Sequence, residues 1–150
     1  MRGHPSSEVV AHGRTRAHWA LLVLFLLAPM GVLLLGLLLE ADPRGHGTHE
    51  QLGAPPCAAM FLFGVPCPGC GVTTAVTLVG EGRLLTAFIV QPFGALLALG
   101  SFAAGALALW ASARKRDLGV LVLARSPLVP ALLGGAALLG AWAYRVALVL

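Results

Sequence analysis

Two cysteines, Cys67 and Cys70, form a Cys-x-x-Cys pair that carries most of the reactive chemistry in this sequence. They lie in residues 64–75, which read GVPCPGCGVTTA. Two thiols at this spacing can close a small disulfide or present two thiolates to one metal ion. A helix beginning near Cys70 would aim free backbone N–H groups at the sulfur atoms, which would lower the pKa of these thiols. We therefore predict the functional site here.

A membrane thiol oxidoreductase is one interpretation of this pair. Cys67 would attack, Cys70 would resolve, and a lipid-soluble acceptor such as a quinone would take the electrons. Cys57, ten residues before Cys67, would be a third partner. A thioredoxin-like fold is excluded, because that motif needs a βαβ setting that the sequence lacks.

A tetrahedral zinc site is the second interpretation. His46-x-x-His49 and Cys67-x-x-Cys70 would supply two histidines and two cysteines if the intervening loop folded over the cysteine turn. Cys57 would replace either histidine. The spacing differs from that of zinc fingers, and a loop histidine is more often simply solvated.

The interpretation that we place first is that the cysteine turn is structural or supports a partner protein, with no enzymatic activity and no required cofactor. Outside the cytoplasm a Cys67–Cys70 or Cys57–Cys67 disulfide would staple a helix-breaking turn. Prolines would fix this turn, glycines would permit its backbone angles, and polar side chains would bond the backbone or cap a helix. The residues of this predicted motif are Pro66, Pro68, Gly69, Gly71, Thr73, Thr74, Gln91 and Pro92.

The composition predicts an all-α, multi-pass helical membrane protein. The 150 residues are 58% hydrophobic and 11% charged, whereas soluble domains carry about 25% charged residues. The basic residues stand beside apolar runs, which indicates membrane orientation rather than nucleic-acid binding. We expect the lipid bilayer as a partner and no nucleic acid.

Three spans are predicted, at 19–39, 92–113 and 127–147. Residues 57–79 are also uncharged, but five glycines and prolines between 64 and 71 interrupt them. We predict a broken, re-entrant segment there, with a short helix to residue 63, a turn at 64–69 and a second short helix to residue 79.

The remaining segments complete one membrane domain, residues 19–150. Residues 1–18 are predicted to be a polar cytoplasmic tail, and 40–56 and 117–126 to be irregular loops.

Counting basic residues favours three spans with the N-terminus inside the cell and the cysteines facing outward across the inner membrane. A three-span arrangement places seven basic residues on one side and two on the other, whereas four spans would give four against five. The seven are Arg2, Arg14, Arg16, Arg114, Lys115, Arg116 and Arg125.

Small residues recur four positions apart in the later spans, as in Gly94 with Ala98 and Ala136 with Gly140. This spacing lets helix backbones approach closely. We expect the second and third spans to pack against each other, and a homodimer or another membrane protein as the alternative partner of these faces.

Three runs carry a family resemblance: GVPCPGCGVTTA at 64–75, GEGRLLTAF at 80–88 and QPFGALL at 91–97. They resemble a bacterial membrane family catalogued as domain of unknown function 2752, over about residues 55–112. Its pattern is an earlier Cys, then Cys-Pro-x-Cys-Gly-x-Thr-Arg-Ala, a Gly-Asp-like turn and Asn-Pro-Leu. The matching positions are Cys57, Cys67, Pro68, Cys70, Gly71, Thr73 and Ala75.

Two positions depart from that pattern. Thr74 stands where the family usually has Arg, and Gln91 where it usually has Asn. A buried Arg beside two sulfur atoms would hold a thiolate or an anionic ligand, so its absence argues against those roles. The family has no established activity, and the resemblance implies a class of protein rather than a function.

Overall fold

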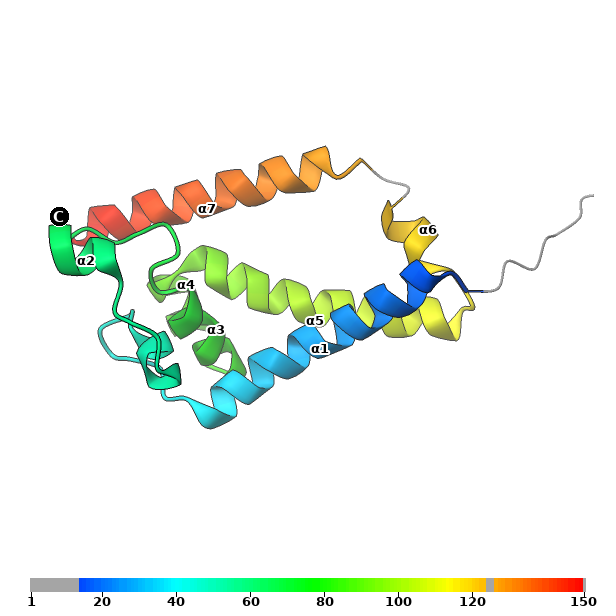
Figure 1. Cartoon of the computed structure of the whole chain (residues 1–150), viewed down its shortest axis with the longest axis horizontal. Coiled ribbons are helices and arrows are strands. Elements are labelled where there is room, and N and C mark those ends of the chain that lie inside the picture. Colours follow the sequence, from blue (N-terminus) through cyan, green and yellow to red (C-terminus); the bar gives the residue numbers. More distant parts are fainter. Residues whose placement is uncertain (1–13, 124–125, 150) are drawn as a thin grey trace, which may run out of the picture.

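The computed structural model describes residues 14–123 and 126–149, and the regular elements there are all helices (Figure 1). The predicted fold class is therefore confirmed. The elements are α1 (Arg16–Leu38), the 3-10 helix η1 (Thr48–Leu52), α2 (Ala58–Phe63), α3 (Val72–Gly80), α4 (Leu84–Val90), α5 (Pro92–Ala113), α6 (Leu118–Leu123) and α7 (Leu128–Val149).

Three of these helices, α1, α5 and α7, are long and apolar enough to cross a membrane. The chain is a membrane protein, and the three predicted spans match these helices closely. The long helices run side by side, with α5 antiparallel to α1 and α7 (Figure 1). One end of the bundle carries η1, α2, α3, α4 and the end of α7, whereas α6 and the start of α1 lie at the other (Figure 1).

The core lies where α1, α3 and α5 meet. The buried residues there are Val32, Ala75, Leu78, Val79, Ala87, Ala95 and Ala98. The backbones of α1 and α3 are in contact at Gly36 and Gly80. A Cβ on Gly36 would strike the backbone of Gly80, and one on Gly80 would strike the carbonyl of Val32, so only glycine permits this approach. This contact seats α3, the helix that follows the cysteine turn, against the first span.

The expected packing of the second span against the third is wrong for the small residues of α5. A Cβ on Gly94 would lie 3.0 Å from Ala75 of α3, and one on Gly105 would lie 3.1 Å from the carbonyl oxygen of Phe25 in α1. On α7, Gly140 has open space around it and Ala136 is exposed. The sequence shows which faces are small but not which neighbour they meet. The homodimer stays a prediction.

The broken segment matches its prediction, since α2 ends at Gly64, a turn follows, and α3 begins at Val72. The irregular loop predicted at 40–56 is wrong at residues 48–52, which form η1. It is wrong again at 117–126, where α6 forms because the Asp117 carboxylate accepts hydrogen bonds from the N–H groups at its start.

The predicted tail also differs at its end. The first helix begins at Arg16, capped by the Thr15 hydroxyl, which accepts from the N–H of His18. His18 is fully buried, and its Nδ1 accepts from the N–H of Leu118 at 3.1 Å. Residues 1–13 of the tail and Arg125 lie outside the described residues.

The glycine contact gives a stability prediction. The substitution Gly36→Ala should destabilise the protein by about 2 kcal/mol, because the added methyl group overpacks the crossing of α1 and α3. Thermal unfolding in detergent would measure this loss. The matched control is Gly31→Ala, in the same helix with nothing within 4 Å, which should cost no stability. Equal effects of the two substitutions would contradict the prediction.

Candidate functional site

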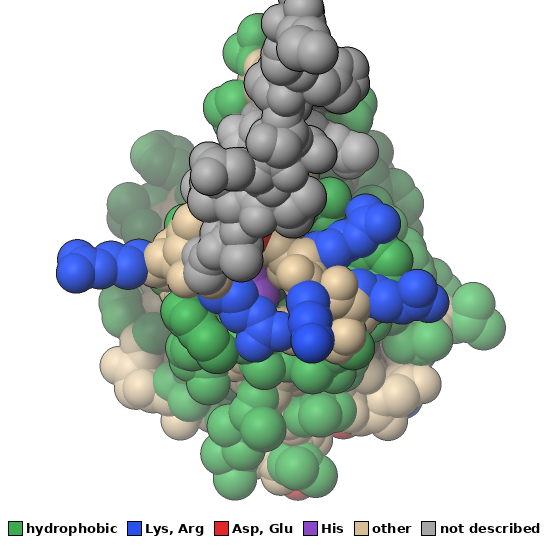
Figure 2. Space-filling view, turned by 90° about the vertical axis from the view of Figure 1, so that its right-hand side faces the viewer, with side chains coloured by type: hydrophobic (Ala, Val, Ile, Leu, Met, Phe, Trp, Pro, Cys, Tyr) green, Lys and Arg blue, Asp and Glu red, His purple; other side chains and the backbone are tan. Residues whose placement is uncertain are grey.

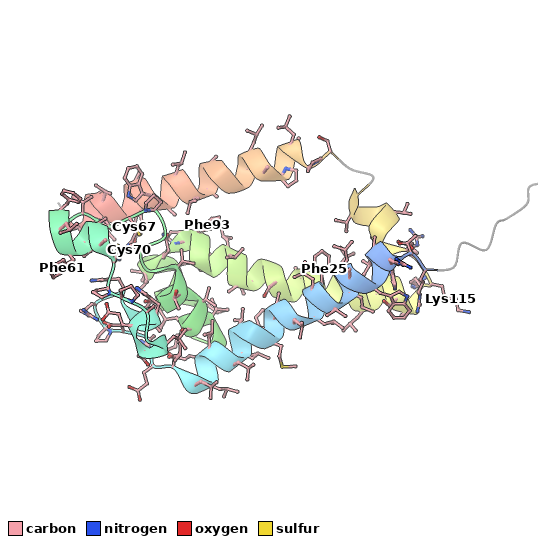
Figure 3. The ribbon with its side chains drawn as sticks, viewed as in Figure 1. Phe25, Phe61, Cys67, Cys70, Phe93 and Lys115 are labelled. Carbon is pink, nitrogen blue, oxygen red and sulfur yellow. The ribbon has the colours of Figure 1, made fainter. Side chains whose placement is uncertain are left out.

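All three cysteines line one cavity of about 420 Å³, together with His49, Thr73 and Thr74. Each cysteine is a free thiol. Cys57 and Cys67 are half-buried, whereas only 5% of Cys70 is exposed. Figure 3 shows Cys67 and Cys70 together at the end of the bundle that carries α2. We call this cavity the thiol pocket.

The cysteine turn is built by local hydrogen bonds and glycine. The N–H of Cys70 donates to the carbonyl of Cys67 at 2.9 Å, which closes the turn across Pro68 and Gly69. Gly71 then adopts φ of 87°, and a Cβ there would lie 2.7 Å from the carbonyl oxygen of Gly45. Only glycine suits this position, both for its backbone angle and for the close approach of the loop.

The loop that precedes α2 contributes His49 to the lining of the thiol pocket. The buried hydroxyls of Thr48 and Thr74 are hydrogen-bonded at 2.9 Å, which ties η1 to α3. Within the loop, Arg44 bonds the carboxylates of Asp42 and Glu50, and its hydrogen bonds lower the pKa of Asp42. These contacts fix His49 at the pocket wall.

The predicted zinc set receives no geometric support. In residues 14–123 and 126–149, no three His, Cys, Asp or Glu side chains are arranged so that they could hold a metal ion. The ring nitrogens of His46 and His49 instead bond the backbone carbonyls of Arg44 and Pro55. His46 does not line the thiol pocket. The zinc site stays an untested prediction.

The three thiols have different electrostatic environments. The backbone N–H of Met60, in the first turn of α2, lowers the pKa of Cys57, and the neighbouring Cys67 thiol lowers it further. Burial raises the pKa of Cys67. Burial, together with repulsion from the other two thiolates, raises the pKa of Cys70 to about 11. Cys57 is therefore the most acidic thiol of the pocket.

This distribution corrects the sequence analysis, which expected the helix after the turn to acidify Cys67 and Cys70. That helix begins only at Val72, and neither of these thiols is acidified. The helix start that acts on a sulfur atom belongs to α2, and the sulfur atom is that of Cys57. The sequence signal was available, because Cys57 directly precedes α2 in the N-cap position.

The last turns of α7 hold this end of the molecule together. Trp142 Nε1 donates to the carbonyl of Pro66 at 2.8 Å, and the Tyr144 hydroxyl donates to the carbonyl of Ile89 at 2.9 Å. Arg145 Nη2 donates to the carbonyl of Gly45 at 3.4 Å. One helix end thus contacts three separate segments around the thiol pocket.

Arg145 points into the molecule rather than into water. Only 8% of the residue is exposed, and its positive charge favours the thiolate of Cys70. Thr74, which stands where the related pattern has Arg, is buried and bonded to Thr48. The cation that acts on a thiol therefore comes from α7, far along the chain, and nothing local in the sequence indicates it.

Gln91 was expected to bond the broken segment or to cap α5. Its side chain is fully buried, and neither of its amide atoms has a hydrogen-bond partner. Both alternatives are therefore wrong for this side chain. Pro92 does begin α5, as predicted, in the first-turn position that suits proline.

Comparison with known families adds one finding. Residues 57–105 match the family model described as Protein of unknown function (DUF2752). The family resemblance expected from the sequence is thereby confirmed over this segment, which contains the three cysteines, α2, α3, α4 and most of α5. Comparison with curated proteins and with solved structures gives no match. Helix α7 lies outside the DUF2752 segment, although Trp142 and Tyr144 bond carbonyls inside it.

The pKa shifts predict an order of thiol reactivity. At pH 7.5 the neutral reagent iodoacetamide should modify Cys57 first, Cys67 more slowly and Cys70 hardly at all, because only the thiolate reacts. Even at pH 8, a thiol with a pKa of about 11 is only ~0.1% ionised. Mass spectrometry of the protein in detergent would give the three rates between pH 6 and 10.

Denatured protein is the control, since the three rates should then converge. Faster modification of Cys70 than of Cys57 in the folded protein would contradict this order.

Proposed function

We propose that this small inner-membrane protein exchanges thiols and disulfides through Cys57 and Cys67. The observation that carries the proposal is that Cys57, whose pKa is lowered, lines one open pocket together with Cys67. A low thiol pKa next to a second thiol is the arrangement that such exchange requires. Cys70 keeps the structural role that the sequence suggested for the whole turn, because it is buried and its pKa is raised.

The substrate class is a disulfide on another molecule. The Cys57 thiolate attacks one sulfur atom of that disulfide, forms a mixed disulfide and expels the other sulfur atom as a thiolate, which takes up a proton. Cys67 then loses its proton and attacks Cys57 Sγ. This step forms the Cys57–Cys67 disulfide and releases the second sulfur atom of the substrate. Two electrons pass from the cysteine pair to the substrate, and the reverse sequence oxidises a dithiol.

The surroundings of the thiol pocket favour a macromolecular substrate. All three hydrophobic residues at the end of α2 are exposed, Phe61 at 79%, Leu62 at 66% and Phe63 at 77%. Figure 3 shows Phe61 projecting from α2 beside the labelled cysteines. An apolar rim next to a thiol pair can hold a peptide segment long enough for exchange to occur.

Glutathione disulfide provides a direct test in detergent. The protein should form the Cys57–Cys67 disulfide, and Cys57→Ser should slow the first exchange at least about tenfold, because the acidic attacking thiol is lost. Cys67→Ser should instead accumulate glutathione on Cys57, since no thiol then resolves the mixed disulfide. Mass spectrometry of acid-quenched samples would distinguish these states.

Cys70→Ser is the matched control and should leave the exchange intact. Loss of exchange in Cys70→Ser, with exchange retained in Cys57→Ser, would overturn the proposal.

We further propose that the thiol pocket faces outward and that the N-terminus lies in the cytoplasm of a bacterial cell. What supports this orientation is the charge at the opposite end of the bundle, where five exposed cations gather. Figure 2 looks onto that end and shows its Lys and Arg side chains. Cytoplasmic flanks of membrane spans carry an excess of such residues. The pocket would then lie in the compartment where disulfides form and persist.

Sidedness can be measured with a membrane-impermeant maleimide on intact cells. After mild reduction, Cys57 should be labelled without permeabilisation, because the thiol pocket then opens to the outside. The control is Lys115→Cys in a chain whose own cysteines are replaced by serine, and it should be labelled only after permeabilisation. The reverse pattern would contradict the orientation and leave the exchange chemistry untouched.

A further inference from the structure

Within the described residues, the end of the bundle opposite the thiol pocket carries five exposed cations and one carboxylate. Figure 2 shows Lys and Arg side chains on this end. Asp117 is the one acidic residue at this end in the described part of the chain, and its carboxylate accepts hydrogen bonds from the N–H and hydroxyl of Thr15 and from the N–H of Gly119. The exposed cations are Arg14, Arg16, Arg114, Lys115 and Arg116.

Two of these cations lie over tryptophan rings. The guanidinium carbon of Arg14 is 5.5 Å from the ring centroid of Trp19, and that of Arg116 is 5.4 Å from the ring centroid of Trp110. Tryptophan rings favour the headgroup level of a bilayer. These contacts therefore hold Arg14 and Arg116 at the height of lipid phosphates.

An apolar groove of about 900 Å³ begins at one of these rings, between α5, α6 and α7. It exists because α7 packs only lightly against α5 on this side of the bundle. Its volume lies in the range of about 300–1,000 Å³ that is typical of small-molecule sites. Trp110 lines the groove while its ring lies beneath Arg116. The lining residues are Leu107, Trp110, Leu121, Val122, Ser126, Pro127, Val129 and Pro130.

The backbone at Lys115 is a second, independent sign of function. Lys115 has φ of 55° and is the only residue other than glycine with positive φ in residues 14–123 and 126–149. It closes α5, with the N–H of Lys115 donating to Ser112 and that of Arg116 donating to Ala111. Glycine is the usual residue at this position, and a side chain retained there in a strained conformation points to a functional role. Figure 3 shows Lys115 projecting from this end of the bundle.

We propose that this end of the protein binds one anionic phospholipid, whose phosphate lies against Arg116 and Lys115 and whose acyl chain enters the groove beside Trp110. The headgroup meets cations that form no ion pair with the described residues, and the acyl chain meets apolar side chains. Each cation near an anionic membrane surface favours binding by about fivefold. The acyl chain of a zwitterionic lipid fits the groove equally well, but its headgroup has no net negative charge to attract the cations. The site therefore prefers lipids with an anionic headgroup.

Fluorescence quenching by brominated lipids tests this site. The full-length protein with Trp19→Phe and Trp142→Phe keeps Trp110 as its only tryptophan. It is reconstituted in phosphatidylcholine vesicles, and either brominated phosphatidylglycerol or brominated phosphatidylcholine is added in rising fractions. The same composition in both leaflets removes any dependence on orientation. We expect phosphatidylglycerol to be preferred about fivefold or more at Trp110.

Matched variants separate charge from fold. Arg116→Gln should reduce the preference to about twofold or less, and Lys115→Gly should lower it while relieving the backbone conformation at that position. Arg83→Gln, which removes an exposed cation at the other end of the bundle, should leave the preference unchanged. Val129→Phe, which fills part of the groove without adding a second tryptophan, should weaken quenching by both lipids.

Two outcomes would overturn the proposal. The first is that the two brominated lipids quench Trp110 equally in the protein whose cations are all unaltered. The second is a loss of preference in Arg83→Gln as large as that in Arg116→Gln, because the effect would then be one of net charge. Neither outcome bears on the thiol pocket, since no cysteine takes part in the measurement.

Discussion

Backbone carbonyls around the thiol pocket need hydrogen-bond donors that a bilayer cannot supply, and the arrangement of this end of the molecule depends on that need. The chain leaves regular structure repeatedly here, and the carbonyls of Gly45, Pro66 and Ile89 each find a side-chain donor on α7. A polar, non-helical segment can therefore sit against the third span. The same contacts bring a buried arginine to the thiols, so one helix end supplies both hydrogen bonds and charge.

The two ends of the bundle have opposite chemistry on a shared scaffold. Glycine lets α1 and α3 pack backbone to backbone, and the small residues of α5 pack closely against both helices. These contacts make a tightly packed core. Thiols and carbonyl-rich turns lie at one end, and exposed cations with Trp19 and Trp110 lie at the other. Because α7 meets the thiol end through hydrogen bonds and packs loosely elsewhere, the bundle stays open toward lipid near Trp110.

Within the thiol pocket, position along the chain is a poor guide to reactivity. The Cys-x-x-Cys spacing draws attention to Cys67 and Cys70, yet burial suppresses the ionisation of both. Cys57 gains the more favourable environment because it precedes a short helix whose first N–H groups are free. All three thiols belong to the DUF2752 segment, whereas Arg145 lies outside it. The thiols of this site therefore come from inside the family segment, whereas the positive charge that acts on Cys70 comes from outside it.

The sequence by itself determined what depends on local composition. Apolar length set the three spans, and proline and glycine set the break between α2 and α3, because both act on the residues that carry them. It also contained the capping signals of Cys57 and Asp117, although these were not recognised. Only the tertiary structure decided that the small residues of α5 face α1 and α3, that Cys57 shares a pocket with Cys67, and that Arg145 turns inward. Those outcomes depend on the rotation of each helix about its axis and on contacts between residues as far apart as Gly45 and Arg145. Many rotations satisfy the same hydropathy pattern, so the pattern alone does not select among them.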